Sequence, residues 1–126
     1  MKKVLKVLSV LFVLSLLFAV MALPSSAATN DLNTTVSVTY EIGDGIDDFE
    51  RNAYVDGGAG IIRMHYNRFL FDEVGVDTFH SMNRHYGIVL FDDKTNSTNI
   101  ALGGEWTNRA DVRVNHNGTA RYDIVF

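Results

Sequence analysis

The sequence contains no cysteine and only one proline in 126 residues. Without cysteine there can be no disulfide framework, no thiol catalysis, and no zinc-finger or iron–sulfur site, because each of these needs sulfur at defined spacing. The chain also lacks a strong excess of basic residues: 21% of its residues are charged and the formal net charge is −4. We therefore expect no nucleic-acid partner, and the length allows one domain.

One long apolar run is present, at the N-terminus. Three lysines precede residues 7–23, and small residues that end in Ala27 follow Pro24. A basic start, an apolar stretch and small residues before a break are typical of a secretory signal peptide, so we predict cleavage after Ala27 and secretion. The alternative is a retained membrane anchor, because a run of about 17 residues reaches the lower limit for crossing a bilayer.

Removal of residues 1–27 makes the remaining chain clearly acidic. It takes away three of the 11 basic residues and none of the 15 acidic ones, which leaves a net charge of about −7. Residues 28–56 hold seven of the acids and a single base, Arg51. We interpret this segment as an acidic N-terminal lead-in with one strand, and residues 57–126 as the core of the domain. The acids form either a solvated surface or a cation site, and the missing calcium-loop spacing favours the solvated surface.

The chain after residue 28 is patterned as β-strands. Apolar and polar side chains alternate in residues 36–42 and 62–66, which is typical of strands with one buried face; the phase then changes to Phe69 and Phe71. Residues 84–91 end in four apolar residues, which predicts a central strand covered on both faces.

The sequence indicates loops and helices less clearly than it indicates strands. The polar residues 92–99 predict a loop, and a helical turn near residues 44–53 is the most helix that the pattern allows. Several short strands with no helical stripe predict an all-β fold, a small antiparallel β-sandwich or barrel.

The last two alternating stretches, residues 110–114 and 120–126, predict a β-hairpin. A two-residue turn at Asn117 and Gly118 would place their apolar faces on opposite sides of a sheet, whereas a three-residue loop that includes His116 aligns them. In this hairpin Gly118 adopts the left-handed conformation, so we expect it not to tolerate a β-branched replacement.

Few residues point to catalysis or to a metal. His80 and His85 are five apart, but two histidines in a polar loop lack the third donor and the rigid geometry that a metal needs. Ser81 adjoins His80, yet neighbours in an extended chain point to opposite faces, which makes a nucleophile–base pair poor. The sequence has no phosphate loop, no nucleophile elbow and no zinc-protease motif, so we expect no enzyme, no cofactor and no metal.

Aromatic and basic residues offer more for ligand binding. Trp106 is the only tryptophan and follows Gly103-Gly104-Glu105. It is either a core aromatic or a platform against which a sugar or a backbone could come close. The planar fork of arginine suits phosphate and carboxylate groups, although solvated sheet faces carry such residues routinely. The arginines concerned are Arg63, Arg68, Arg84, Arg109, Arg113 and Arg121.

An ordered set of motifs runs through the last part of the chain: Phe79-His80, His85, Ile88-Val89, Asp92-Asp93, Thr95, Gly104-x-Trp106, Ala110-x-Val112 and Thr119-Ala120-x-Tyr122. In this order, with the leader and the absence of cysteine, the chain resembles the lactococcin 972 family of secreted bacteriocins. Extended loosely to Gly57-Gly58, the resemblance covers about 70 of the 99 residues that remain after cleavage.

The resemblance implies a β-sandwich of two small antiparallel sheets that is exported to act on other bacteria. It further implies a non-enzymatic activity: binding of the cell-wall precursor lipid II and a block of septum formation without pores. We take His80, Arg84, His85 and Trp106 as the candidate ligand-binding residues. Immunity or ABC-type export proteins are the further partners, and an exposed edge strand would allow a homodimer.

Two other functional classes stay open at this point. The first is an extracellular structural or adhesive β module without antibacterial activity. The second is a small hydrolase that uses His80 or His85.

Overall fold

The computed structural model describes residues 32–68, 72–114 and 117–126. The predicted signal peptide and its cleavage site, and also Phe69 and Phe71, lie outside this part of the chain. No helix in the described ranges is long and apolar enough to cross a membrane. The secondary structure consists of β1 (Thr35–Ile42), β2 (Phe49–Val55), the 3-10 turn η1 (Asp56–Gly58), β3 (Gly60–Asn67), β4 (Asp72–His80), β5 (Tyr86–Phe91), β6 (Lys94–Ser97), β7 (Ala110–Val114) and β8 (Gly118–Val125).

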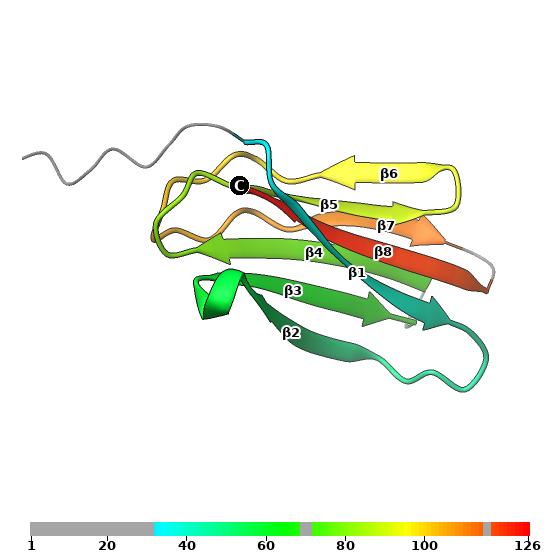
Figure 1. Ribbon diagram of the computed structural model, residues 1–126. Helices are drawn as coiled ribbons and strands as arrows, with labels where there is room; N and C mark the ends of the chain where they lie inside the picture. The colour runs from blue at the N-terminus through cyan, green and yellow to red at the C-terminus, as the bar shows by residue number, and fades with distance from the viewer. Residues whose placement is uncertain (1–31, 69–71, 115–116) are drawn as a thin grey trace, which may run out of the picture.

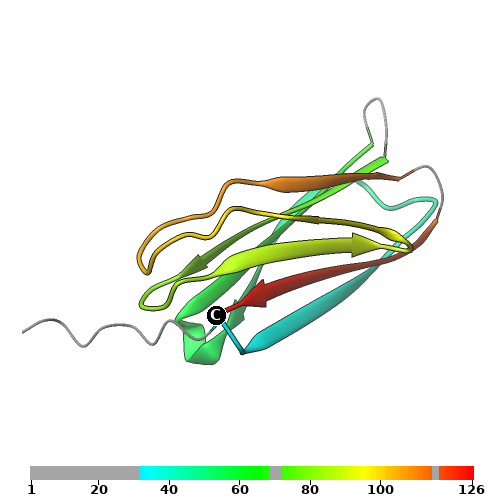
Figure 2. The same cartoon turned by 90° about the horizontal axis from the view of Figure 1, so that it is seen from above.

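The strands form two four-stranded antiparallel sheets that pack face to face (Figures 1 and 2). One sheet has the order β1-β8-β5-β6 and the other has the order β2-β3-β4-β7. The predicted small antiparallel β-sandwich is therefore confirmed. The two sheets are called here the β8 sheet and the β3 sheet, after a central strand of each.

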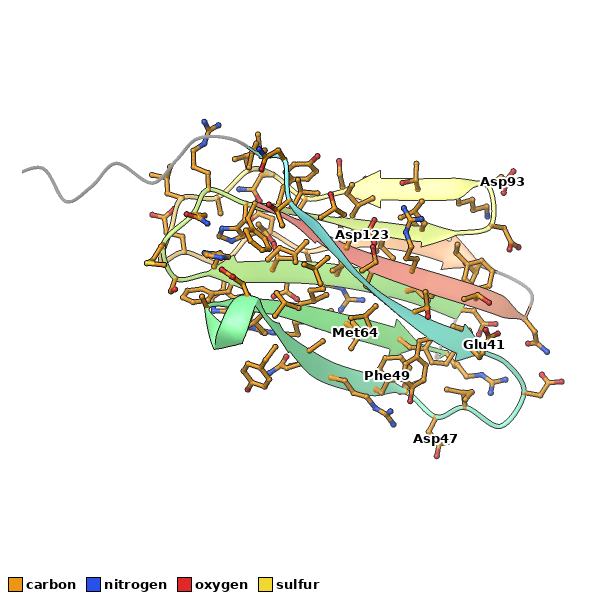
Figure 3. The ribbon with its side chains drawn as sticks, in the orientation of Figure 1. Glu41, Asp47, Phe49, Met64, Asp93 and Asp123 are labelled. Carbon is orange, nitrogen blue, oxygen red and sulfur yellow. The ribbon has the colours of Figure 1, made fainter. Side chains whose placement is uncertain are left out.

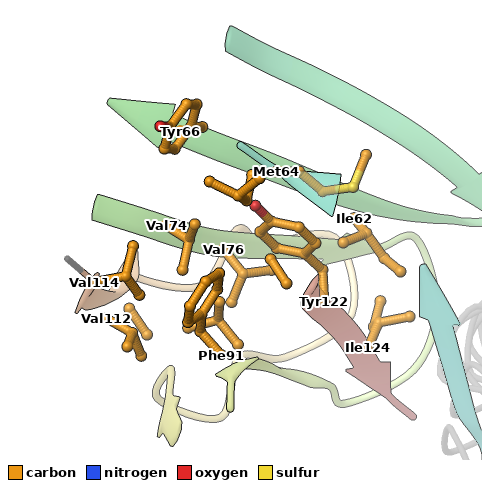
Figure 4. Packing of buried hydrophobic residues seen from close by; sticks show 14 residues of the cluster. Ile62, Met64, Tyr66, Val74, Val76, Phe91, Val112, Val114, Tyr122 and Ile124 are labelled. Carbon is orange, nitrogen blue, oxygen red and sulfur yellow. The ribbon is translucent and has the colours of Figure 1, made fainter. Parts of the chain in front are cut away.

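The core lies between the sheets and is built from alternate residues of every strand except β6 (Figure 4). Ile62, Met64 and Tyr66 point inward from β3, as their alternation predicts. Tyr122 is fully buried on β8, and its hydroxyl donates a hydrogen bond to the backbone oxygen of His65 across the core, at 3.3 Å. With no disulfide in the described part, burial of these apolar side chains is the main source of stability.

The predicted C-terminal hairpin is wrong, because β7 and β8 belong to different sheets. Val112 of β7 pairs with Val74, whereas Tyr122 of β8 pairs with Val38 and Val89. Two alternating strands can bring their apolar faces together side by side in one sheet or face to face across a core, and the sequence pattern is the same in both cases.

The predicted reason for glycine at position 118, a left-handed backbone conformation, is also wrong. The positive-φ glycines of the described residues are Gly45, Gly57, Gly58 and Gly104, and Gly118 is not among them. A Cβ atom at Gly118 would lie 2.9 Å from Cζ of Phe91, which is closer than real Cβ atoms approach. The side chain is therefore excluded by packing and not by backbone conformation.

Three strands were not predicted. β2 occupies the second half of residues 44–53, where at most a helical turn was expected, so residues 28–56 contribute two strands, one to each sheet. β4 was missed, and β6 lies within the predicted loop 92–99. All four residues of β6 are exposed, so no alternation of apolar residues marks it in the sequence.

The strand β5 has two neighbours in its sheet, as predicted, but only one face of it is fully covered. Val89 and Phe91 are buried in the core, whereas Ile88 and Leu90 are half-buried on the outer face. Its apolar run therefore reflects a partly covered outer face and not helices or a second sheet packed on both sides.

Candidate ligand-binding face

The outer face of the β3 sheet carries a row of apolar side chains across four segments. Tyr54 of β2 pairs with Ile61 of β3, Ile61 pairs with Phe79 of β4, and Phe79 forms a β-bridge with Trp106. The even-numbered residues of β3 and β4 point into the core, so Ile61 and Phe79 point outward. Their paired neighbours Tyr54 and Trp106 lie on the same outer face. Tyr54 is 68% exposed and Trp106 is 39% exposed, so the row offers aromatic surface to solvent at both of its ends. We call Tyr54, Ile61, Phe79 and Trp106 the aromatic row.

Arg63 fixes one end of the aromatic row. Its guanidinium carbon lies 3.8 Å from the centroid of the Trp106 ring, which is a cation–π contact, and its Nε lies 3.5 Å from Oδ2 of Asp77. The Phe79 ring stands beside the indole with a centroid distance of 5.4 Å. Trp106 is thus held by an arginine, which is itself held by a carboxylate on the neighbouring strand.

His65 extends this polar network along the face. It is buried, with Nε2 2.5 Å from Oδ1 of Asp77 and Nδ1 3.6 Å from Oε2 of Glu50. Each ring nitrogen therefore faces a carboxylate, and neither is directed at a hydroxyl nucleophile as in a catalytic triad. The series Glu50, His65, Asp77 and Arg63 acts chemically as an ordered set of donors and acceptors across β2, β3 and β4.

A pocket of about 280 Å³ lies beside this network. Arg109 reaches across the sheet surface over Gly75, donates hydrogen bonds to Asp111 and to Oε1 of Glu73, and lines the pocket. A Cβ at Gly75 would collide with Oδ1 of Asp111 and come within 2.7 Å of Nε of Arg109, so any larger residue there would push this ion pair away from β4. The other lining residues are Asp48, Phe49, Glu50, His65, Tyr66 and Asn67.

Of the four candidate ligand-binding residues, only Trp106 lies on this face. His80, at the end of β4, is fully buried: its Nδ1 accepts hydrogen bonds from the backbone N–H groups of Met82, at 3.2 Å, and Asn83, at 3.0 Å. Its Nε2 must then carry the proton, and it lies 3.1 Å from Oδ2 of Asp56. His80 therefore holds the turn between β4 and β5 in place.

His85 is likewise internal. Its Nδ1 lies 2.9 Å from the backbone oxygen of Asn83 and its Nε2 lies 3.3 Å from that of Thr78. The two histidine rings are 6.3 Å apart, and Arg84 between them is half-buried. Both histidines thus bind backbone groups of their own chain and present no surface to a ligand in this conformation. In the described part, no three potential ligand side chains are grouped to hold a metal.

The sequence did not identify most of this face. Arg63 and Arg109 are among the arginines that the sequence offers for a phosphate or carboxylate group, but no sequence pattern assigns a binding role to Tyr54, His65, Asp77 or Phe79. The outward-facing residues of each strand could be identified from the alternation in the sequence. Which of them become neighbours is known only when the pairing and register of β2, β3 and β4 are known.

Neither a protein-family model, nor a curated protein, nor a solved structure matches this chain. The resemblance to the lactococcin 972 family therefore rests on the ordered sequence motifs alone.

Proposed function

We propose that this chain is a secreted, non-enzymatic antibacterial protein that binds the cell-wall precursor lipid II and blocks septum formation in competing bacteria. The resemblance in the sequence supplies lipid II as the ligand. The observation that carries the assignment to a surface is the aromatic row, which runs beside an ordered network of charged side chains on one face of the sandwich.

The chemistry of the row suits a sugar. Pyranose rings present apolar C–H faces that stack on aromatic side chains, and their hydroxyls bind ordered donors and acceptors such as Arg63 and Asp77. Tyr54 and Trp106 are separated by three strand spacings, a span of about 14 Å. The two directly linked sugar rings of the lipid II disaccharide are shorter than this span, so they can lie along the row between its two exposed ends.

The charges of the face favour the sugar part of the ligand over its pyrophosphate. Arg63 is paired with Asp77, and Arg109 is paired with Glu73 and Asp111. A phosphate group would have to displace these carboxylates, at the cost of broken charge-assisted hydrogen bonds. A neutral, hydroxyl-rich ligand can accept and donate within the network without separating the ion pairs.

The experiment compares the secreted protein with three single variants on dividing bacteria and on vesicles that contain lipid II. Tyr54→Ala and Trp106→Ala each remove one end of the row, and Thr39→Ala, exposed on the outer face of the β8 sheet, is the matched control. We expect growth inhibition with missing septa for the native protein and the control, and a loss of both activity and lipid II binding for the row variants.

Two results would contradict the proposal. No growth effect and no lipid II binding at micromolar protein would remove the antibacterial function. Binding to whole cells or to sugar polymers without growth inhibition would instead favour the structural or adhesive module, for which the same exposed aromatic row would serve as the contact surface.

A further inference from the structure

One end of the sandwich concentrates exposed apolar side chains. The described residues include five large hydrophobic side chains that are exposed, and four of them come from residues 81–85, between β4 and β5, and residues 99–106, between β6 and β7. We call these two loops the apolar tip. The four side chains are Met82 (65% exposed), Leu102 (59%), Ile100 (49%) and Trp106 (39%). Large apolar side chains gathered in this way mark an interaction site.

The two loops of the apolar tip are fastened to each other. His85 and Ala101 exchange both backbone hydrogen bonds, at 3.0 and 2.9 Å, and the N–H of Gly104 donates to the backbone oxygen of His80 at 2.8 Å. Gly103 packs so closely on the backbone of Met82 that any Cβ would collide with it. The apolar side chains are therefore presented by a rigid frame, and their exposure is not the result of a loose loop.

Negative charge is concentrated at the end of the molecule opposite the apolar tip. The apolar tip holds Arg84 and Glu105, which give no net charge, and Asp56 beside it is paired with the buried His80. The far end holds two bases, Lys94 beside the β5–β6 turn and Arg68 against the β1–β2 loop, and a larger number of acids: five exposed aspartates in the same two segments, of which Figure 3 shows Asp47 and Asp93. The five are Asp44, Asp47, Asp48, Asp92 and Asp93.

We propose that the apolar tip docks on a lipid bilayer and inserts Met82, Ile100 and Leu102 shallowly into its surface. An anionic bacterial membrane repels the aspartate end and so turns the apolar tip toward the lipid. Trp106 then lies at the depth of the head groups, where tryptophan is favoured in membrane proteins. Three inserted side chains give reversible binding and not an anchor.

This orientation complements the proposed function without depending on it. The aromatic row ends at Trp106, so docking would hold the row at the membrane surface, where the sugars of lipid II are located. Contact between the apolar tip and lipid needs no lipid II, however, so the two proposals can be tested separately.

The experiment uses the secreted protein and vesicles of phosphatidylethanolamine and phosphatidylglycerol that contain no lipid II. Trp106, as the single tryptophan, reports on its own surroundings. We expect co-sedimentation with the vesicles, a blue shift of the tryptophan emission, and quenching by lipids brominated near the head group. The double variant Met82→Ser/Leu102→Ser should lower the partition coefficient about tenfold or more.

Tyr54→Ser is the matched control, because Tyr54 is as exposed as Met82 but lies on β2 outside the apolar tip. It should leave partitioning unchanged, and thermal unfolding should show that all variants remain folded. Absence of co-sedimentation and of any emission shift would overturn the docking proposal, as would equal partitioning of the double variant and the native protein. Binding only to vesicles with lipid II, unchanged in the double variant, would also overturn docking while leaving the proposed function intact.

Discussion

The guanidinium carbon of Arg63 lies 3.8 Å from the centroid of the Trp106 ring, on the outer face of the β3 sheet. This contact links the aromatic row to the charged network, because Arg63 also pairs with Asp77. Arg63→Ala should expose the indole to water, shift its emission to longer wavelength, and lower the free energy of unfolding by about 1 kcal/mol. Arg63→Lys keeps the charge but loses the planar stack, so its emission wavelength and its free energy of unfolding should lie between those of the native protein and of Arg63→Ala. Fluorescence and urea unfolding measure both effects, and unchanged emission in Arg63→Ala would show that the contact is not formed in solution.

His80 is predicted to matter for stability and not for ligand contact. Its replacement by alanine leaves the N–H groups of Met82 and Asn83 without their acceptor and opens space in the interior. We expect the free energy of unfolding to fall by about 2–4 kcal/mol. His80→Asn places an amide oxygen near the position of Nδ1 and should recover part of this loss. Urea denaturation provides the measurement; if alanine and asparagine variants were equally destabilised, the role assigned to Nδ1 would be wrong.

Gly118 should be constrained by Phe91. A Cβ at Gly118 would come within 2.9 Å of the Phe91 ring, so Gly118→Val should lower the free energy of unfolding by about 1–3 kcal/mol. Gly118→Asn separates packing from backbone conformation as the reason for this glycine. Asparagine adopts the left-handed conformation readily but carries a Cβ atom, so we expect it to destabilise the protein through the contact with Phe91. In a double-mutant cycle, Phe91→Leu should relieve part of the Gly118→Val cost. Strict additivity of the two changes would contradict the packing explanation.

The buried hydroxyl of Tyr122 should make the protein less stable at alkaline pH. Burial raises the pKa of its hydroxyl well above the usual value of about 10, so the unfolded chain loses this proton at lower pH than the folded protein does. Between these two pKa values the unfolded state binds fewer protons, and the free energy of unfolding therefore decreases as pH rises above about 10.

The test compares thermal unfolding at pH values from about 8 to about 11 for three proteins. Tyr122→Phe should flatten the alkaline decline, because it removes the ionisable hydroxyl together with one hydrogen bond to the backbone of His65. Tyr54→Phe, which alters an exposed hydroxyl, should leave the decline as it is in the native protein. An identical decline in all three proteins would exclude Tyr122 as its source.

The alternation of residues in the sequence was sufficient to predict the sandwich, because it identifies which side chains of β1, β3, β7 and β8 turn inward. It was not sufficient to predict which strands pair. Val112 and Tyr122 follow the same pattern whether their strands adjoin or face each other, and only the assembled core decides between the two. β2 and β6 carry too few buried apolar residues to be recognised alone.

The candidate site was harder to predict than the fold for a related reason. His80 and His85 lie among polar residues in the sequence, but backbone groups of the turn bind their rings and allow both to be buried. The aromatic row, in contrast, joins residues as distant in sequence as Tyr54 and Trp106 through the register of three strand pairings. Such a surface exists only once the register is set.

Titration of the isotope-labelled protein without residues 1–27 with the water-soluble head group of lipid II, followed by NMR, decides whether the aromatic row binds the precursor. We predict saturable changes in the amide signals of Tyr54, Ile61 and Phe79 and in the indole signal of Trp106 at micromolar to millimolar ligand. No saturable change, or changes confined to the outer face of the β8 sheet, would contradict the proposed function.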